Sequence, residues 1–254
     1  GRAAAGMVPR VPSLAMAPSR AVAESSPLEW VRRERVDDGA DRPLLLLLHG
    51  SEDDPAAMLA WSDALDPEGR FRALVAAAPF GTAEARTWFT STPRGPMGAE
   101  IRVALDRLGA TVDRARAEPG VSADPAVVLG YSQGGAMALL LASERVTPVT
   151  AAVSVCGWLP DGEGWSNQAA AEARTRPPPR VLVLNTRDDD VVPIDFGEAS
   201  ALALRSDGLA ADFLVVDGTH HPELEVVRMA GEWLYDVAGD STGAGSSGKD
   251  WNTF

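Results

Sequence analysis

Ser132 lies within a Gly-Tyr-Ser-Gln-Gly-Gly segment, residues 130–135, whose composition suits the presentation of a nucleophile. The apolar run Ala126–Leu129 precedes this segment, and a helix-like run, Ala136–Ala142, follows it. A serine on a tight turn between a strand and a helix has its hydroxyl exposed at the sheet edge, and flanking glycines let the backbone close around it. We therefore predict a nucleophilic serine; the alternative is a structural Gly-Ser turn.

A serine hydroxyl is a weak nucleophile that needs a general base, and the base needs a third group to orient it. The chain has three histidines, His49, His220 and His221. The adjacent pair follows an expected strand, Asp212–Val216, and precedes an expected helix. An imidazole with a pKa near 6.5 can take the serine proton and return it to a leaving group. We expect one histidine of the pair to be the base and the other to be a bystander.

Three consecutive carboxylates, Asp188, Asp189 and Asp190, follow the expected strand Arg180–Leu184. Neighbouring carboxylates repel one another, so we expect a partner to hold one of them while the others are solvated. Serine, acid and histidine then occur in the chain order of a doubly wound hydrolase sheet, each after a successive strand. A metal site and a charged surface loop are the competing interpretations of the acidic triplet.

His49 and Gly50 follow the apolar run Leu44–Leu48. A glycine at this point frees backbone N–H groups to face a developing oxyanion, and the N–H of Gln133, after the nucleophile, is a second donor. His49 lies on the wrong element for the chain order given above. We therefore predict that His49 is structural.

Short apolar runs alternate with longer amphipathic runs through the middle of the chain. This alternation is typical of an α/β fold with a mostly parallel central sheet and helices on both faces. The expected strands are Leu44–Leu48, Ala73–Ala77, Ala126–Leu129, Ala151–Val155, Arg180–Leu184 and Asp212–Val216. The clearest helices are Ala99–Ala117, Gly134–Arg145, Asp195–Arg205 and Pro222–Val237.

The 254 residues suffice for one large α/β domain, which we assign to residues 28–238. Residues 1–27 mix Gly, Ala, Pro and Arg without periodicity, so we predict a disordered segment there. Residues 239–254 are predicted to form a flexible tail, rich in Gly and Ser.

The formal net charge of −13 argues against binding to nucleic acids or anionic membranes, which repel an acidic protein. Cys156 is the only cysteine, so an intramolecular disulfide is impossible. No stretch approaches the roughly 20 apolar residues of a membrane span. We therefore expect a cytoplasmic protein without a membrane span; whether it forms a homodimer is left open.

These motifs resemble those of the phospholipase/carboxylesterase family of α/β-hydrolases, which includes acyl-protein thioesterases and small bacterial carboxylesterases. Residues 130–135 match the family pattern G-[FY]-S-Q-G-G at every position. The family motif H-G-x-G-D corresponds to residues 49–53, W-F to residues 88–89, and S-G-x-L-P to residues 156–160, where Cys156 replaces the serine. The resemblance spans roughly residues 42–238.

The resemblance selects among the candidates. Keeping the Val-Pro pair of H-G-x-x-D-x-x-V-P in register over residues 185–193 makes Asp189 the acid, with Asp188 and Asp190 as the alternatives. The motif G-x-x-H, starting at Gly218, makes His221 the base and His220 its neighbour. The family thus implies a catalytic triad and an oxyanion hole, formed by Ser132, His221 and Asp189 and by the backbone N–H groups of Ser51 and Gln133.

The resemblance implies a serine hydrolase of carboxylic esters that works through an acyl-enzyme, with a small-molecule ester as partner and no cofactor or metal. Thioesters and lysophospholipids are further substrate classes. A non-catalytic ligand-binding homologue and a peptidase on the same fold are the rival readings. We expect Trp88, Phe89 and Trp158 to bind substrate, with core packing as the alternative.

The chain departs from the family pattern at two places. Glu52 replaces the second glycine of H-G-x-G-D, and Asn185-Thr186 replace the His-Gly pair that opens the acid motif. Glu52 places a charged side chain beside the oxyanion loop.

Overall fold

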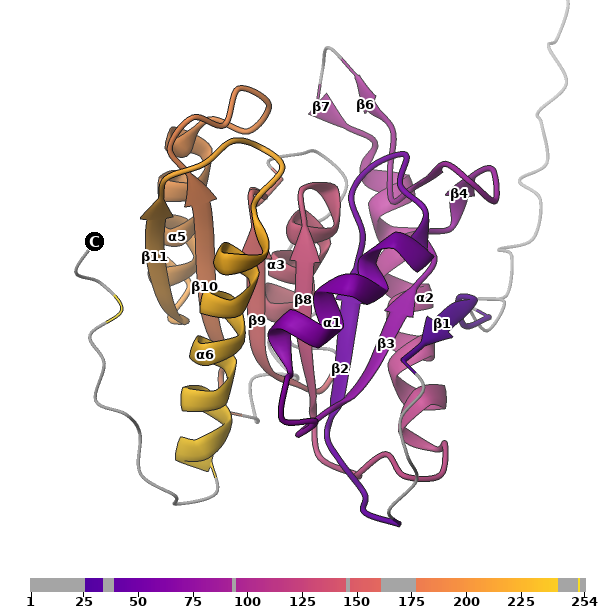
Figure 1. Cartoon of the computed structure of the whole chain (residues 1–254). Helices are drawn as coiled ribbons and strands as arrows, with labels where there is room; N and C mark the ends of the chain where they lie inside the picture. Colours follow the sequence, from indigo (N-terminus) through magenta and orange to yellow (C-terminus); the bar gives the residue numbers. More distant parts are fainter. Residues whose placement is uncertain are drawn as a thin grey trace, which may run out of the picture.

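A seven-stranded sheet forms the centre of the computed structural model, which describes residues 26–33, 39–92, 95–144, 147–160, 177–241 and 251 (Figure 1). The strand order is β1-β3-β2-β8-β9-β10-β11, and only the pairing of β1 with β3 is antiparallel. The strands are β1 (Trp30–Arg32), β2 (Leu44–Leu48), β3 (Arg72–Ala76), β8 (Ala126–Tyr131), β9 (Val149–Val155), β10 (Arg180–Thr186) and β11 (Ala210–Val216). The predicted mostly parallel sheet is confirmed.

Helices cover both faces of this sheet, as predicted. One face carries α1 (Leu59–Leu65) and α6 (Leu224–Ser241); the other carries α2 (Gly98–Arg116), α3 (Gln133–Glu144) and α5 (Ile194–Ser206) (Figure 1). The remaining short elements are the 3-10 turn η1 (Pro55–Met58) and two small hairpins, β4 (Phe80–Gly81) with β5 (Arg86–Thr87) and β6 (Ser91–Thr92) with β7 (Gly95–Pro96).

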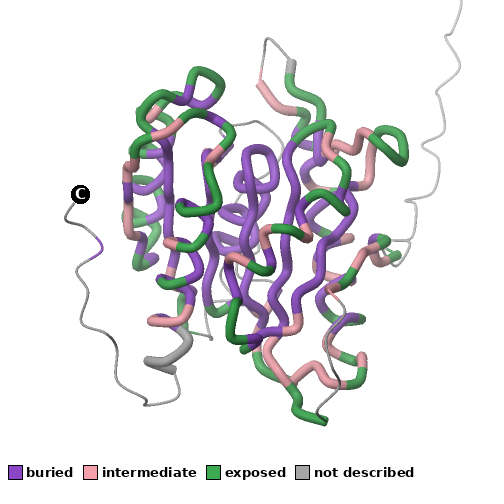
Figure 2. Tube along the Cα trace, viewed as in Figure 1, coloured by how far each residue is buried: buried purple, intermediate pink, exposed green. Residues whose placement is uncertain are grey.

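The five leucines of β2 explain why its sequence is a continuous apolar run. Leu44, Leu46 and Leu48 pack into the core beneath α2 and α3, whereas Leu45 and Leu47 pack into the core beneath α1 and α6. All five side chains are buried, and Figure 2 shows the central strands buried along their length. A parallel strand covered on both faces requires apolar side chains at every position.

The predicted end segments fall mostly outside the described residues. Residues 1–25, 242–250 and 252–254 belong to this group, so disorder there stays a prediction. Trp251 is described: its side chain is buried, and its indole N–H donates to Asp236 Oδ2 of α6 at 3.1 Å. In the described part of the chain, no helix combines the length and hydropathy needed to cross a bilayer.

Candidate active site

Ser132 occupies a single-residue turn between β8 and α3. Its φ is +52°, a left-handed conformation that is unfavourable for a residue with a Cβ. The turn is held by hydrogen bonds on both sides, from the Ser132 N–H to the Val155 carbonyl and from the Ala136 N–H to the Ser132 carbonyl. The backbone therefore presents this serine on a strained turn at the carboxyl edge of the sheet, as its sequence context predicts.

The glycines around Ser132 are required by close backbone approaches. A Cβ at Gly130 would lie 2.0 Å from the carbonyl oxygen of Gly134, and a Cβ at Gly134 would lie 2.1 Å from that of Leu48. Both distances are far below van der Waals contact. The small residues thus let α3 start directly against the ends of β2 and β8.

His220 joins Ser132 to Asp189. Its Nε2 lies 3.0 Å from Ser132 Oγ, and its Nδ1 lies 2.8 Å from Asp189 Oδ2. A carboxylate only accepts, so Nδ1–H donates to it and the neutral imidazole keeps Nε2 free to accept the serine O–H. All three residues are at least nine-tenths buried, which shields these hydrogen bonds from water.

Asp189 is the member of the acidic triplet that the fold holds in place. Its Oδ1 accepts from the backbone N–H groups of Val191 and Val192, at 2.9 and 2.7 Å, as well as facing His220. Asp188 and Asp190 are exposed. The structure thus places the carboxylate selected by the family register beside an imidazole and leaves its neighbours in solvent.

The selection of His221 over His220 needs correction. His221 is exposed, and its Nδ1 lies 2.9 Å from the Tyr131 hydroxyl, away from Asp189. The loop before the pair is fixed at two points, because the Gly218 carbonyl accepts from the Asp188 N–H and the Thr219 carbonyl accepts from the Thr186 hydroxyl. The next residue, His220, therefore lies against Asp189, one position before the histidine that the G-x-x-H motif selects.

The two N–H groups expected to form an oxyanion hole lie on the loop after β2 and at the start of α3. Within the described residues, neither the Ser51 nor the Gln133 backbone N–H has a hydrogen-bond acceptor. Glu52, beside Ser51, adopts φ +60°, and its N–H donates to the Arg86 carbonyl at 2.7 Å. Glu52 thus adopts a left-handed conformation at the position of the second family glycine. Glycine adopts this conformation without strain.

The side chain of Gln133 has a structural role that sequence reasoning missed. Its Oε1 accepts from the Thr87 hydroxyl and from the Trp88 N–H, and its Nε2 donates to the Phe89 carbonyl, each at 2.7 Å. The amide of one buried side chain therefore holds three consecutive residues beside the nucleophile turn. A glutamine side chain carries both an acceptor and a donor, and this property could have suggested the role.

Trp88 and Phe89 do not line a site as expected. Their side chains are 0% and 1% exposed, and the Trp88 indole N–H donates to the His49 carbonyl at 2.9 Å. The expectation that they contact substrate is corrected to core packing. Trp158 is partly exposed and packs edge-on against Phe89, with ring centroids 6.2 Å apart, so its contact with substrate stays a proposal.

His49 is held as a neutral structural residue. Its Nδ1 donates to the Gly50 carbonyl at 2.7 Å, and its Nε2 accepts from the Ala78 N–H at 3.1 Å. Burial lowers the pKa of this imidazole below its usual 6.5, since desolvation disfavours the charged form. Both ring nitrogens are engaged, which leaves none to act as a base.

A thiol lies beside the Ser132–His220–Asp189 chain. Cys156 Sγ, a nitrogen of His220 and an oxygen of Asp189 lie within 4.8 Å of one another. Burial raises the pKa of the thiol to about 11, so the thiolate that a metal requires is disfavoured near neutral pH. The imidazole and the carboxylate already satisfy each other, so the donor set suits a hydrogen-bonded chain better than a metal site.

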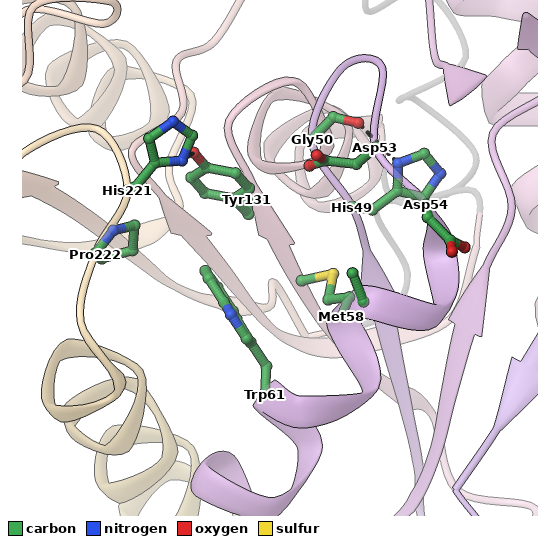
Figure 3. A pocket seen from close by; sticks show the side chains of 10 residues that line it. His49, Gly50, Asp53, Asp54, Met58, Trp61, Tyr131, His221 and Pro222 are labelled. Carbon is green, nitrogen blue, oxygen red and sulfur yellow. Dashed lines mark hydrogen bonds between the residues drawn. The ribbon is translucent and has the colours of Figure 1, made fainter. Parts of the chain in front are cut away.

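A cavity of about 190 Å³ lies on the α1 and α6 side of the Ser132 turn (Figure 3). Apolar groups form much of its wall: Met58 at the end of η1, Trp61 in α1, Tyr131 at the end of β8, and Pro222 before α6. Asp53 and His221 also line it. Sequence reasoning missed this cavity because α1 was not among the predicted helices.

A mostly parallel sheet with helices on both faces and a serine on a strained strand-to-helix turn at its carboxyl edge is the α/β-hydrolase fold. The chain belongs to the phospholipase/carboxylesterase family, whose model matches residues 35–232.

Known proteins resemble this chain in sequence and in fold. A probable carboxylesterase of Oryza sativa subsp. japonica is 32% identical over 120 residues, which are 46% of this chain and 43% of the relative. The chain thus aligns with less than half of that relative's length. Among solved structures, the Bacillus cereus carboxylesterase superposes with a TM-score of 0.67 at 19% identity, covering 83% of this chain and 94% of the other. Zea mays acyl-protein thioesterase 2 superposes with a TM-score of 0.63 at 22% identity, covering 84% and 100%.

Proposed function

We propose that the protein is a carboxylesterase-type serine hydrolase, with Ser132 as nucleophile, His220 as general base and Asp189 as the group that orients it. The observation that carries the proposal is the continuous hydrogen-bonded chain, 3.0 Å from Ser132 Oγ to His220 Nε2 and 2.8 Å from His220 Nδ1 to Asp189. Family membership supports the same reaction class.

The reaction proceeds in two halves. His220 Nε2 takes the Ser132 proton as Oγ attacks the ester carbonyl carbon, and the resulting oxyanion accepts hydrogen bonds from the Ser51 and Gln133 N–H groups. Collapse of this intermediate breaks the bond to the alcohol, which leaves with the proton from His220. Water, deprotonated by the same imidazole, then cleaves the acyl-enzyme and releases the carboxylic acid and free Ser132.

Carboxylic esters are the substrates that we propose, and thioesters are a second class. The thioester proposal is supported by the fold likeness to the maize acyl-protein thioesterase. A cytoplasmic location and independence from metals and cofactors stay predictions, and the formation of a homodimer stays open. A ligand-binding homologue would keep the pocket without catalysis, and a peptidase would cleave amides.

The first test is the rate of p-nitrophenyl acetate hydrolysis by Ser132→Ala. The variant is expected to lose kcat by roughly 10⁴- to 10⁶-fold, as other triads do. The matched control is Ser206→Ala, which removes an exposed hydroxyl from the end of α5 and is expected to keep the parent rate.

A fluorophosphonate probe gives a second readout, because only an activated serine is labelled. Labelling of the parent and not of Ser132→Ala supports the mechanism. Equal hydrolysis by parent and variant would refute it, and an unlabelled, inactive parent would favour a binding protein. Faster cleavage of aminoacyl amides than of the matching esters would favour a peptidase.

A further inference from the structure

The cavity adjoins the proposed catalytic groups through Tyr131, which lines it, whereas Ser132 and His220 are not among the lining residues. Tyr131 directly precedes Ser132, and its ring centroid lies 5.3 Å from that of His220 and 5.4 Å from that of Trp61. The Trp61 indole rises from α1 toward Tyr131 in Figure 3. These two rings contact each other, so a group bound in the cavity would lie against them, next to the residue that precedes Ser132.

Asp53 gives this cavity a negative charge. A Cβ built on Gly50 would lie 2.5 Å from Asp53 Oδ2 and 3.0 Å from Tyr131 Cε1, so the carboxylate lies over the loop and near the edge of the ring. Among the residues that the structure describes, the Asp53 carboxylate has no hydrogen-bond or ion-pair partner. A partly buried carboxylate without such a partner favours the approach of a cation.

The described lining holds no permanently charged cation to balance this carboxylate. It contains neither Lys nor Arg; of its two histidines, His49 is neutral with both nitrogens engaged, and His221 has its Nδ1 against the Tyr131 hydroxyl. The guanidinium of Arg86, outside the lining, is bound to the Glu29 carboxylate and to the Ala78 carbonyl. Asp54 adds a second carboxylate, which accepts from the Ala56 N–H.

We propose that this cavity is a subsite for a small organic cation, an alkylammonium or trimethylammonium group carried by the ester substrate. The faces of Trp61 and Tyr131 attract a cation through their quadrupoles, and Asp53 compensates its charge. Met58 and Pro222 provide apolar contact for methyl groups. The volume of about 190 Å³ is smaller than the pockets that take whole drug-sized ligands, which suits a head group.

The specificity test rests on the proposed esterase function and compares two esters of the same shape. Acetylcholine and 3,3-dimethylbutyl acetate differ only in a positively charged nitrogen in place of a carbon. We expect the parent enzyme to prefer the choline ester in kcat/KM, and we expect Asp53→Asn to reduce this preference about tenfold. Trp61→Leu removes one aromatic face without changing charge and is expected to reduce it as well.

Asp63→Asn is the matched control for charge. Asp63 lies on the same helix, two residues after Trp61, but its carboxylate is exposed and pairs with Arg33. This variant is expected to keep the parent preference. A ratio that is unchanged in folded Asp53→Asn and Trp61→Leu, or a ratio lowered equally by Asp63→Asn, would overturn the proposal.

A binding measurement separates the subsite from catalysis. Calorimetric titration of tetramethylammonium into Ser132→Ala is expected to show binding, weakened about tenfold when Asp53→Asn is added. Binding to Ser132→Ala together with no esterase activity in the parent would refute the proposed function and leave the cation subsite standing. No binding of tetramethylammonium, or equal binding to both variants, would refute the subsite even if the esterase is active.

Discussion

His220 and His221 are neighbours in the chain that face different partners. The side chain of His220 is buried between Ser132 and Asp189, whereas His221 is exposed and contacts the Tyr131 hydroxyl. The sequence offers two chemically identical residues here, and only the hydrogen bonds that fix the preceding loop decide between them. An error of one residue in aligning the motif is therefore enough to assign the role of base to the wrong histidine.

The substitution of each histidine by glutamine tests this assignment. His220→Gln is expected to lower kcat for p-nitrophenyl acetate by roughly 10⁴- to 10⁶-fold, because an amide cannot serve as the base. His221→Gln loses contacts with Tyr131 and with the His220 ring but removes no group of the proposed triad, so we expect less than about a tenfold change. Circular dichroism confirms that both variants are folded. The reverse ranking would return the role of base to His221.

At the scale of helices and strands, patterns in the sequence predict some elements and miss others. The strand Leu44–Leu48 and helices such as Gly98–Arg116 were predicted within a few residues, because long apolar runs and amphipathic periods arise from burial itself. The helix Leu59–Leu65 and the strand Trp30–Arg32 were missed. Seven and three residues are too few to show a period, and packing of these segments against distant parts of the chain stabilises them.

Gln133 attaches residues 87–89 to α3, so we expect its side chain to contribute to the stability of the fold. Gln133→Ala removes three hydrogen bonds: the buried Trp88 N–H loses its acceptor, and the Phe89 carbonyl keeps only the Thr87 hydroxyl, 3.2 Å away. We expect the free energy of unfolding to fall by about 2–4 kcal/mol, since an unsatisfied buried polar group costs about 1–3 kcal/mol. Urea denaturation measures this change.

Thr87→Val serves as the control for that experiment. It removes one hydroxyl from the same set of contacts and leaves the amide bonded to both backbone groups. A smaller loss of stability is expected than for Gln133→Ala. Equal losses in the two variants would show that the backbone hydrogen bonds of Gln133 contribute little.

At the scale of the whole molecule, the two cores share one sheet, and the proposed chemistry depends on loops from both sides of it. The turn of Ser132 leads into a helix on one face, whereas the loop of His220 leads into α6 on the other. The chain order of serine, acid and histidine on successive strand ends was predictable, because parallel strands bring their carboxyl ends to one edge. The cavity lined by Trp61 was not, because it depends on how α1 packs near the loop before α6.

The buried His49 links the stability of the whole domain to pH. It connects the end of β2 with Ala78 and, through its carbonyl, with Trp88. Its folded-state pKa is lowered, chiefly by desolvation, so the unfolded state binds a proton more readily. The stability that its neutral form contributes is complete above about pH 6.5 and is lost as the pH falls from there toward the folded-state pKa.

Urea denaturation at pH 7 and pH 5 measures this linkage. Relative to His49→Gln, whose amide does not titrate, the parent is expected to lose up to about 2 kcal/mol more stability between the two pH values, at 1.4 kcal/mol for each pH unit below 6.5. Titrating carboxylates affect parent and variant alike, so the difference between them isolates His49. An identical pH dependence in the parent and His49→Gln would show that the fold does not hold His49 neutral. The contacts of His49 with Ala78 and Trp88 would then not depend on the protonation state of its imidazole.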